Sequence, residues 1–247
     1  MKALIQYILQ FILGYQNYLW VFTRYKLRRL KKDPSEKDFF HFLNMLNVDD
    51  TVLDIGANLG LMSFFLAKKV KKVHAFEPIP SNIEVLRKLK ASKKLDNLEI
   101  HNTALGNSTG EIDLILPVVR GVRKQGLSHV KHEKMTEFNQ GETHKSSIYK
   151  LDDYHEISNE RIAGIKIDVE NFEYEVFQGA RQRILADKPL IYSELWDNQN
   201  RYDCFDLMKN LGYNIFVLHQ DKLQLFEDVK SQTQNFFFIH QDYTFAQ

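Results

Sequence analysis

The chain has 247 residues, of which 44% are hydrophobic and 26% are charged, and its formal net charge is +1 at pH 7. This length suits one large domain with an appendage better than two independent enzyme domains. The small net charge gives no electrostatic reason to expect a nucleic-acid partner. The single cysteine, Cys204, excludes an internal disulfide framework and fits a reducing compartment. No cysteine and histidine cluster has the sequence spacing of a zinc site.

The N-terminal segment, residues 1–35, differs from the rest of the chain. Residues 4–22 are mostly apolar, and Gln6, Gln10 and Asn17 fall on one stripe of a helical projection. An apolar face opposite a polar stripe predicts an amphipathic helix. A basic cluster follows, made of Arg24, Lys26, Arg28, Arg29, Lys31 and Lys32.

Several roles are open for this helix. The basic cluster comes after the apolar part, and no small-residue cleavage site follows, which does not fit a signal peptide. An amphipathic helix next to basic and aromatic residues can lie among the headgroups of an anionic membrane. We therefore expect a cytoplasmic protein with peripheral contact of residues 1–32 at the inner face of the membrane. Packing on protein and a membrane-spanning helix are the alternatives.

Residues 51–60 have the pattern of a buried strand followed by a glycine turn. Residues 51–55 are mostly apolar, as in a parallel strand that is buried on both faces. Gly56 and Gly60 leave the turn without side chains, so a ligand can approach the backbone and a helix can pack closely on the strand. We predict that this turn binds a cofactor through Asp54, Gly56, Asn58 and Gly60.

The acid Glu77 follows the next predicted strand, about 20 residues beyond the turn, where a carboxylate can accept hydrogen bonds from ribose hydroxyls. A dinucleotide site has a glycine two positions after the first glycine, whereas this chain has Asn58 there. Asp54 adds a negative charge that repels phosphate and attracts a cation. S-adenosylmethionine carries a sulfonium and no phosphate, so it is preferred over NAD. An NAD-dependent oxidoreductase is the alternative.

Strands alternate with helices over residues 36–247, which predicts a mostly parallel, doubly wound α/β sheet with an antiparallel C-terminal edge. We expect the third strand at 98–105 and helices at 36–46, 173–185 and 205–211. The carboxyl ends of the parallel strands should meet at one rim, where open α/β sheets bind ligands.

Residues 117–147 interrupt this alternation with glycines and basic side chains. We expect a mobile insertion that covers the rim as a substrate lid, with a solvated connection as the alternative. As a lid, its basic side chains would favour an acceptor that bears phosphate or carboxylate. They are Arg120, Arg123, Lys124, His129, Lys131, His132, Lys134 and His144.

Five segments together resemble the FkbM-family methyltransferases. Residues 54–60 are similar to the family's cofactor turn, and residues 75–78 to its ribose-binding strand end. Residues 102–106 are similar to the segment beside the adenine. Residues 151–154 and 165–170 match two later signatures. The combination is specific, whereas each piece alone would be weak.

The resemblance runs from about residue 36 to the end. It implies a Rossmann-like class I methyltransferase fold, S-adenosylmethionine as cofactor, and methyl transfer to a hydroxyl, often on sugars or polyketide-like metabolites. It implies that Asn102 and Ala104 lie beside the adenine. Asn171 departs from the family, which has glycine there, but asparagine tolerates left-handed backbone geometry better than most residues.

Methyl transfer to a hydroxyl needs a group that removes the acceptor proton. Asp168 and Glu170 are the first candidates for this base, and Glu194 at the next strand end is the third. Asp168 is also expected to bind the cofactor. His129 and His132 are alternative bases. The acids could instead hold a divalent cation that activates the hydroxyl, although we do not favour this.

The acceptor is expected to be a small molecule or a glycan precursor, anionic or lipid-linked. A membrane-associated scaffold that keeps the fold without catalysis is a further alternative. The sequence does not indicate an oligomeric state.

Overall fold

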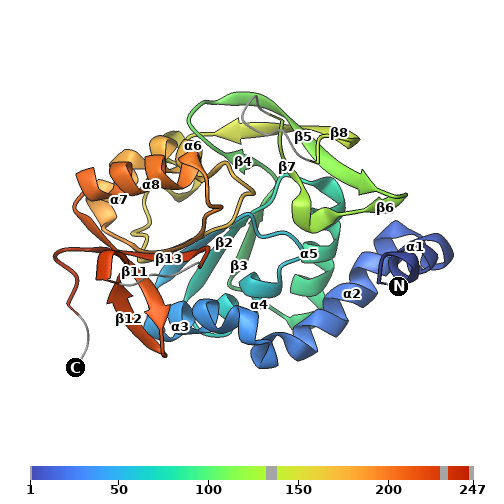
Figure 1. Cartoon of the computed structure of the whole chain (residues 1–247), viewed down its shortest axis with the longest axis horizontal. Coiled ribbons are helices and arrows are strands. Elements are labelled where there is room, and N and C mark those ends of the chain that lie inside the picture. Colours follow the sequence, from blue (N-terminus) through green and yellow to red (C-terminus); the bar gives the residue numbers. More distant parts are fainter. Residues whose placement is uncertain (1, 132–137, 229–232, 245–247) are drawn as a thin grey trace.

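An eight-stranded sheet forms the centre of the computed structural model, which describes residues 2–131, 138–228 and 233–244 (Figure 1). The strand order is β12-β11-β13-β10-β9-β1-β2-β3. The five strands from β10 to β3 are parallel to one another, whereas β13 is antiparallel to β10. The bounds are β1 Thr51–Ile55, β2 Lys72–Phe76, β3 Leu98–His101, β9 Gly164–Ile167, β10 Leu190–Glu194, β11 Tyr213–His219, β12 Lys222–Leu225 and β13 Asn235–His240.

Helices cover both faces of this sheet, because its central strands are apolar on both sides. Val52, Val73 and Tyr192 pack against the helices of one face, and Leu53 and Ile165 against those of the other. The predicted doubly wound α/β sheet with an antiparallel C-terminal edge is confirmed. The first face carries α3 Lys37–Met45, α4 Leu61–Ala67 and α5 Pro80–Lys93; the second carries α6 Glu173–Gly179, α7 Arg181–Asp187 and α8 Gln199–Asn210.

A second, smaller sheet lies next to the central sheet, at the top of Figure 1. Its main pair is antiparallel, β5 Gly110–Val119 with β8 Gly141–Tyr149. The described parts of the predicted insertion 117–147 thus contain strands where a loop was expected, and residues 132–137 lie outside the description. The hydrophobic periodicity of the sequence did not indicate β8, because its lysine, histidine and serines are typical of a polar loop. The other strands are β4 Ala104–Leu105, β6 Val122–Arg123 and β7 His129–Val130.

The predicted N-terminal helix is two helices, α1 Lys2–Leu13 and α2 Tyr15–Arg29. The chain bends at Gly14, whose φ of 70° is costly for residues with a Cβ. Buried Tyr18 and Leu19 of α2 pack with Val85 of α5. The N-terminal segment is therefore packed on the sheet domain through α2.

Three other predicted elements differ in their bounds. The expected strand 98–105 is divided, because β4 leaves the central sheet and pairs with β8. The expected helix 173–185 is interrupted at Ala180. The last helix starts at Gln199 and not at 205, because the side chain of Asn198 accepts a hydrogen bond from a backbone N–H of the first turn. Short 3₁₀ turns connect elements at Leu30–Lys32, Pro34–Glu36, Gln125–Leu127, Leu151–Asp153, His155–Ile157 and Phe226–Asp228.

Candidate active site

The glycine turn packs tightly between two elements of the sheet domain. A Cβ on Gly56 would lie 1.9 Å from the backbone oxygen of Asp168, and one on Gly60 would lie 2.1 Å from Leu86 Cδ1. Both glycines have positive φ, 76° and 78°. Gly56 lines the pocket at the rim, whereas Gly60 supports the turn by letting α5 approach.

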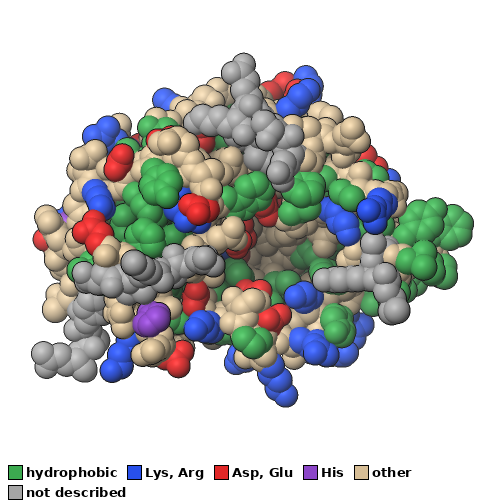
Figure 2. Space-filling view, in the orientation of Figure 1, with side chains coloured by type: hydrophobic (Ala, Val, Ile, Leu, Met, Phe, Trp, Pro, Cys, Tyr) green, Lys and Arg blue, Asp and Glu red, His purple; other side chains and the backbone are tan. Residues whose placement is uncertain are grey.

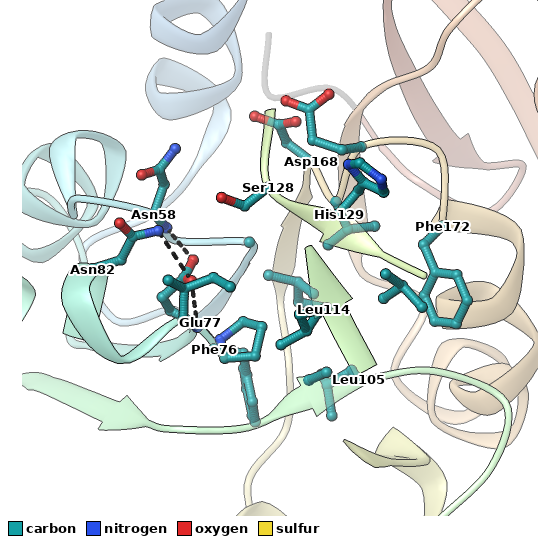
Figure 3. Close-up of a pocket in the computed structure, with 18 of the residues that line it drawn as sticks. Asn58, Phe76, Glu77, Asn82, Leu105, Leu114, Ser128, His129, Asp168 and Phe172 are labelled. Atoms are coloured by element: carbon teal, nitrogen blue, oxygen red, sulfur yellow. Dashed lines mark hydrogen bonds between the residues drawn. The ribbon is translucent and has the colours of Figure 1, made fainter. Parts of the chain in front are cut away.

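The buried carboxylate of Glu77 lies on the turn side of the same pocket (Figure 3). Its Oε2 accepts a hydrogen bond from the Asn58 backbone N–H at 2.8 Å. Its Oε1 accepts from the Ile79 backbone N–H at 2.8 Å and from Asn82 Nδ2 at 3.2 Å. Burial raises the pKa of Glu77 to about 7, although these hydrogen bonds favour the charged form. The carboxylate is held in place and faces the pocket.

The two residues expected beside the adenine have different positions. Ala104 lines the pocket together with Thr103 and Leu105. Asn102 does not line it: its Nδ2 donates to the backbone oxygens of Glu77 at 3.2 Å and Pro78 at 3.3 Å. Asn102 therefore supports the strand end that carries Glu77.

Asp54 lies behind the turn and is fully buried. Its Oδ1 is 3.2 Å from Lys166 Nζ, and its Oδ2 accepts a hydrogen bond from Ser63 Oγ. Lys166 Nζ also donates to the backbone oxygen of Gly56 at 2.9 Å and lies 3.8 Å from Asp168 Oδ2. Burial alone would lower the pKa of Lys166, but the two aspartates raise it above its ordinary value. Asp54 thus anchors a lysine, and its charge does not face the pocket.

Asp168 and Glu170 line the pocket opposite Glu77. Figure 3 shows Asp168 across the pocket from Glu77 and Asn58. Glu170 and Asn171 both have left-handed backbone, with φ of 53° and 71°. Asn171 thus has the left-handed backbone geometry that asparagine was expected to tolerate at the position of the family's glycine. Burial, and then the neighbouring charges of Asp168 and Glu194, raise the pKa of Glu170.

A buried acid that sequence reasoning missed holds this loop. Glu173 Oε1 accepts from the backbone N–H groups of Val169 and Asn171, both at 3.2 Å. Its Oε2 accepts from Asn200 Nδ2 at 2.8 Å. Burial raises the pKa of Glu173 to about 8. The sequence showed only a charged residue in the first turn of a helix, which is usually exposed.

Glu194 does not line the cofactor pocket. It lines a neighbouring groove, and burial followed by the negative charge of Asp168 raises its pKa. Glu36 lines the same groove and also feels the charge of Asp168. Asp168, which follows β9 and lines the pocket, therefore lies close to Glu194, which ends β10 and lines the groove. The groove is also lined by Ser35, Met62, Tyr192, Gln234 and Asn235.

The second sheet contributes uncharged groups to the pocket. Gln125, Gly126, Ser128 and Val130 line it beside His129. His129 is buried, and its ring nitrogens lie 2.9 Å from the Leu127 backbone oxygen and 3.1 Å from Asn139 Oδ1. Both nitrogens have partners, which makes His129 a poor base. His132 lies outside the described residues.

Among the residues that line the pocket in the described part of the chain, three are acids and none is lysine or arginine. A phosphate would meet acidic side chains without a cation to pair with, whereas a sulfonium or an ammonium would be stabilised by Asp168. A ribose would find a fixed acceptor in Glu77. The pocket therefore fits S-adenosylmethionine and does not fit a dinucleotide.

Residues 54–228 match the family of the methyltransferase FkbM domain, which is more than half of the chain. The chain belongs to the FkbM methyltransferase family. This membership confirms the predicted family. It argues against the alternative, an NAD-dependent oxidoreductase. The same residues span the turn, Glu77, the second sheet and the three candidate catalytic acids.

Two curated relatives match parts of this FkbM-family chain. The AMB antimetabolite synthetase AmbE of Pseudomonas aeruginosa is 26% identical over 218 residues, which cover 72% of this chain and 10% of that protein. The probable ribosomal RNA small subunit methyltransferase A of Methanosphaera stadtmanae is 40% identical over 52 residues, 21% of this chain and 19% of that protein. The chain thus spans a small part of the curated relatives it matches.

A solved structure has the same fold as this family member. The crystal structure of a methyltransferase FkbM from Methylobacillus flagellatus KT has a TM-score of 0.53 and 16% sequence identity, over 79% of this chain and 44% of that chain. The predicted class I methyltransferase fold is confirmed.

Proposed function

We propose that the protein transfers a methyl group from S-adenosylmethionine to a hydroxyl of a small-molecule or glycan acceptor. The observation that carries this proposal is the composition of the pocket lining: three acidic side chains, with no lysine or arginine among the described lining residues. Glu77 would accept hydrogen bonds from the ribose hydroxyls, and Ala104 would lie beside the adenine. Asp168 would face the charged methionine end, with Glu170 beside it. The bound cofactor supplies an activated methyl group on its sulfonium.

The groove beside Glu194 is the proposed acceptor site, because it opens next to the acids that border the cofactor pocket. As the new oxygen–carbon bond forms, the carbon–sulfur bond breaks and its electron pair stays on sulfur. The hydroxyl proton passes to a carboxylate. Glu194 is the preferred base, since its raised pKa gives it more affinity for a proton than an ordinary glutamate; Asp168 and Glu170 are the neighbouring candidates.

A divalent cation between the acids is the alternative way to activate the hydroxyl. Lys166 already places a positive charge 3.8 Å from Asp168 Oδ2, so the acids have less need of a second cation. We therefore prefer base catalysis. Full activity in chelator is the expected result, and loss of activity that magnesium restores would favour the metal.

The charge around the groove favours a neutral acceptor such as a sugar hydroxyl. The expectation of an anionic acceptor depended on basic side chains of the insertion, but the clearest of them have other partners. Arg123 Nη2 lies 2.6 Å from Glu142 Oε1, and Lys124 Nζ donates to Gln6 Oε1 at 2.7 Å. A polyanion such as RNA would approach Glu36, Glu194 and their neighbours unfavourably.

The outer face of α1 supports peripheral contact with a membrane. Gln10 donates to the Arg123 backbone oxygen and accepts from its N–H, at 3.2 and 3.1 Å, so the polar stripe of α1 faces the protein. The apolar face is turned to solvent, as the patch at the right of Figure 2 shows. Its exposed residues are Leu4, Ile5, Tyr7, Ile8, Leu9, Phe11 and Ile12.

Charge favours an anionic lipid surface over a second protein as the partner of this patch. Residues 1–32 contain seven lysines and arginines and no aspartate or glutamate. Anionic headgroups attract such a segment, and an apolar helix face can bury itself among them. No helix in the described residues is both long and apolar enough to cross a membrane. We place the enzyme at the cytoplasmic face of the membrane, where a lipid-linked sugar precursor would be within reach.

Vesicle flotation tests this placement. The double variant Phe11→Glu with Ile12→Glu should lose binding to anionic vesicles, because both side chains are exposed on α1, at 81% and 69%. Val48→Glu is the matched control, since Val48 is equally exposed, at 65%, but lies outside α1. Equal recovery of all three proteins would contradict membrane contact, and a change of oligomeric state in the α1 variant would favour a second copy.

Calorimetry and transfer of labelled methyl test the function itself. The protein should bind S-adenosylmethionine and not NAD, and Glu77→Gln should weaken binding while Glu111→Gln, an exposed substitution, should not. Extracts of small molecules, lipid-linked glycans and RNA then serve as acceptors. Binding of NAD alone would contradict the proposal. Cofactor binding without transfer to any fraction would favour a non-catalytic scaffold.

A further inference from the structure

Two buried histidines meet at the edge of the central sheet, outside the candidate active site. His74 of β2 is opposite Glu99 of β3 in the strand register, and His101 follows two residues later on the same side. His74 is fully buried and His101 is 7% exposed. The parallel pairing of β2 and β3 brings these residues together from positions 27 apart in sequence, so local spacing could not reveal the cluster.

Three side-chain atoms of this cluster converge on one point. His74 Nδ1 and His101 Nε2 are 2.9 Å apart, and Glu99 Oε2 is 3.4 Å from His74 Nδ1. The three ligand atoms all lie within 4.8 Å of one another. Tetrahedral zinc with bonds near 2.1 Å separates its ligand atoms by roughly 3.3 Å. Small rotations of the side chains would therefore give a zinc-binding geometry.

The outer nitrogens of both rings face carboxylates. His74 Nε2 lies 3.3 Å from Glu160 Oε1, and His101 Nδ1 lies 3.2 Å from Glu156 Oε2 and 2.9 Å from the hydroxyl of Tyr154. When an inner nitrogen binds a metal ion, the outer nitrogen of the same ring carries the proton, and the nearby carboxylate stabilises that arrangement. In the metal-free protein, one proton between the two inner nitrogens accounts for their 2.9 Å separation, and a metal ion would take the place of that proton. Metal-bound histidines have this same pairing of an outer nitrogen with a carboxylate.

The charges of the surrounding groups also fit a divalent ion. Lys72 Nζ lies 2.7 Å from Glu160 Oε1 and 3.0 Å from Glu99 Oε1, which leaves Glu99 Oε2 to face His74. With neutral imidazoles, the three glutamates and Lys72 have a formal charge of −2. A divalent cation would neutralise this charge. Glu99 is half exposed, so an ion and one water ligand can enter from solvent.

We propose that His74 Nδ1, His101 Nε2 and Glu99 Oε2 bind a zinc ion that joins β2 to β3. Two imidazoles and one carboxylate suit zinc, with water in the fourth position. The backbone oxygen of His101 accepts a hydrogen bond from the N–H of Glu77 at 3.1 Å, so the ion lies beneath the strand end that carries the pocket carboxylate. The zinc fixes this strand pair and takes no part in methyl transfer.

Titration of the metal-free protein with zinc, in competition with a chromophoric chelator, tests the site. One equivalent should bind, and the melting temperature should rise with zinc concentration because zinc binds the folded state. Glu99→Gln should weaken zinc affinity more than about tenfold. This substitution is at a half-exposed surface position, so the protein should still fold. His219→Asn, at the exposed end of β11, should leave the affinity unchanged.

A second pair of variants separates binding from general stability. Cobalt bound to the wild type should show the visible absorption of a tetrahedral site, and this absorption should disappear in His74→Asn with His101→Asn. Glu160→Gln, which removes a carboxylate that lies next to both His74 and Lys72 without changing any of the three ligands, should weaken zinc roughly 10–100-fold. Absence of stoichiometric binding, or equal affinity in wild type and Glu99→Gln, would overturn the site and leave a proton shared between the two rings.

Discussion

Lys166 and Asp54 form a buried ion pair, with Nζ and Oδ1 3.2 Å apart, directly beneath the glycine turn. Their side chains are 3% and 0% exposed. Lys166→Met should reduce the free energy of unfolding by about 3–5 kcal/mol, because Asp54 would remain buried without a counter-charge. Urea denaturation measures this loss. Asp54→Asn with Lys166→Met should recover part of it, and the exposed control Lys145→Met should change stability by less than about 0.5 kcal/mol.

Gly56→Ala should abolish cofactor binding, since its Cβ would overlap the backbone oxygen of Asp168 at 1.9 Å. Gly126→Ala is the matched control, because Gly126 lines the same pocket and a Cβ there meets no atom within 4 Å. Calorimetric titration with S-adenosylmethionine distinguishes the two variants. Equal affinities would mean that the cofactor does not approach this turn.

Stability should fall as pH rises through about 7, the raised pKa of Glu77. Burial makes the folded state hold this proton more tightly than the unfolded state, whose glutamate has a pKa near 4.5. The stabilisation of the folded state by protonated Glu77 is fully present below about pH 4.5 and is lost above about pH 7. The shift corresponds to about 3 kcal/mol. Urea denaturation between pH 4 and 9 measures the free energy of unfolding, and Glu77→Gln should remove this part of its pH dependence. An unchanged pH profile would mean that another group causes the pH dependence.

Glu194→Gln should lower kcat by about 10²–10⁴ while cofactor affinity stays the same, because Glu194 lines the acceptor groove and not the cofactor pocket. Single-turnover transfer of labelled methyl separates these two quantities. Glu227→Gln, at an exposed position, is the control. A normal kcat in Glu194→Gln together with a large loss in Asp168→Asn would move the base to Asp168.

Glu173→Ala should destabilise the loop that carries Asp168 and Glu170. The substitution leaves the backbone N–H groups of Val169 and Asn171 without their acceptor, which costs about 1–3 kcal/mol for each buried group. Hydrogen exchange of these two amides should become faster. Glu173→Gln keeps an acceptor oxygen and should retain most of the protection; equal exchange in both variants would contradict this role.

The sequence was sufficient for features that depend on local pattern. The glycine turn and Glu77 could be predicted because a strand, a turn and an acid occur in order along the chain. Glu173 and Lys166 could not, since their burial depends on how separate strands and helices pack. The sequence also could not predict that the apolar face of α1 is turned to solvent. Hydrophobic periodicity identifies two faces of a helix, but it does not show which face packs on the protein.

The hydrogen bonds between α1 and β6 have a consequence for any shortened form of this protein. Gln6 and Gln10 contact Lys124 and Arg123, and the next residues along the chain, Gln125 and Gly126, border the pocket. A chain that begins at residue 36 would keep every family motif. It would still lose the α1 hydrogen bonds that support the segment of the second sheet lining the pocket. We therefore expect the pocket of such a truncated chain to be less ordered, and a loss of its activity would not show that the intact chain is inactive.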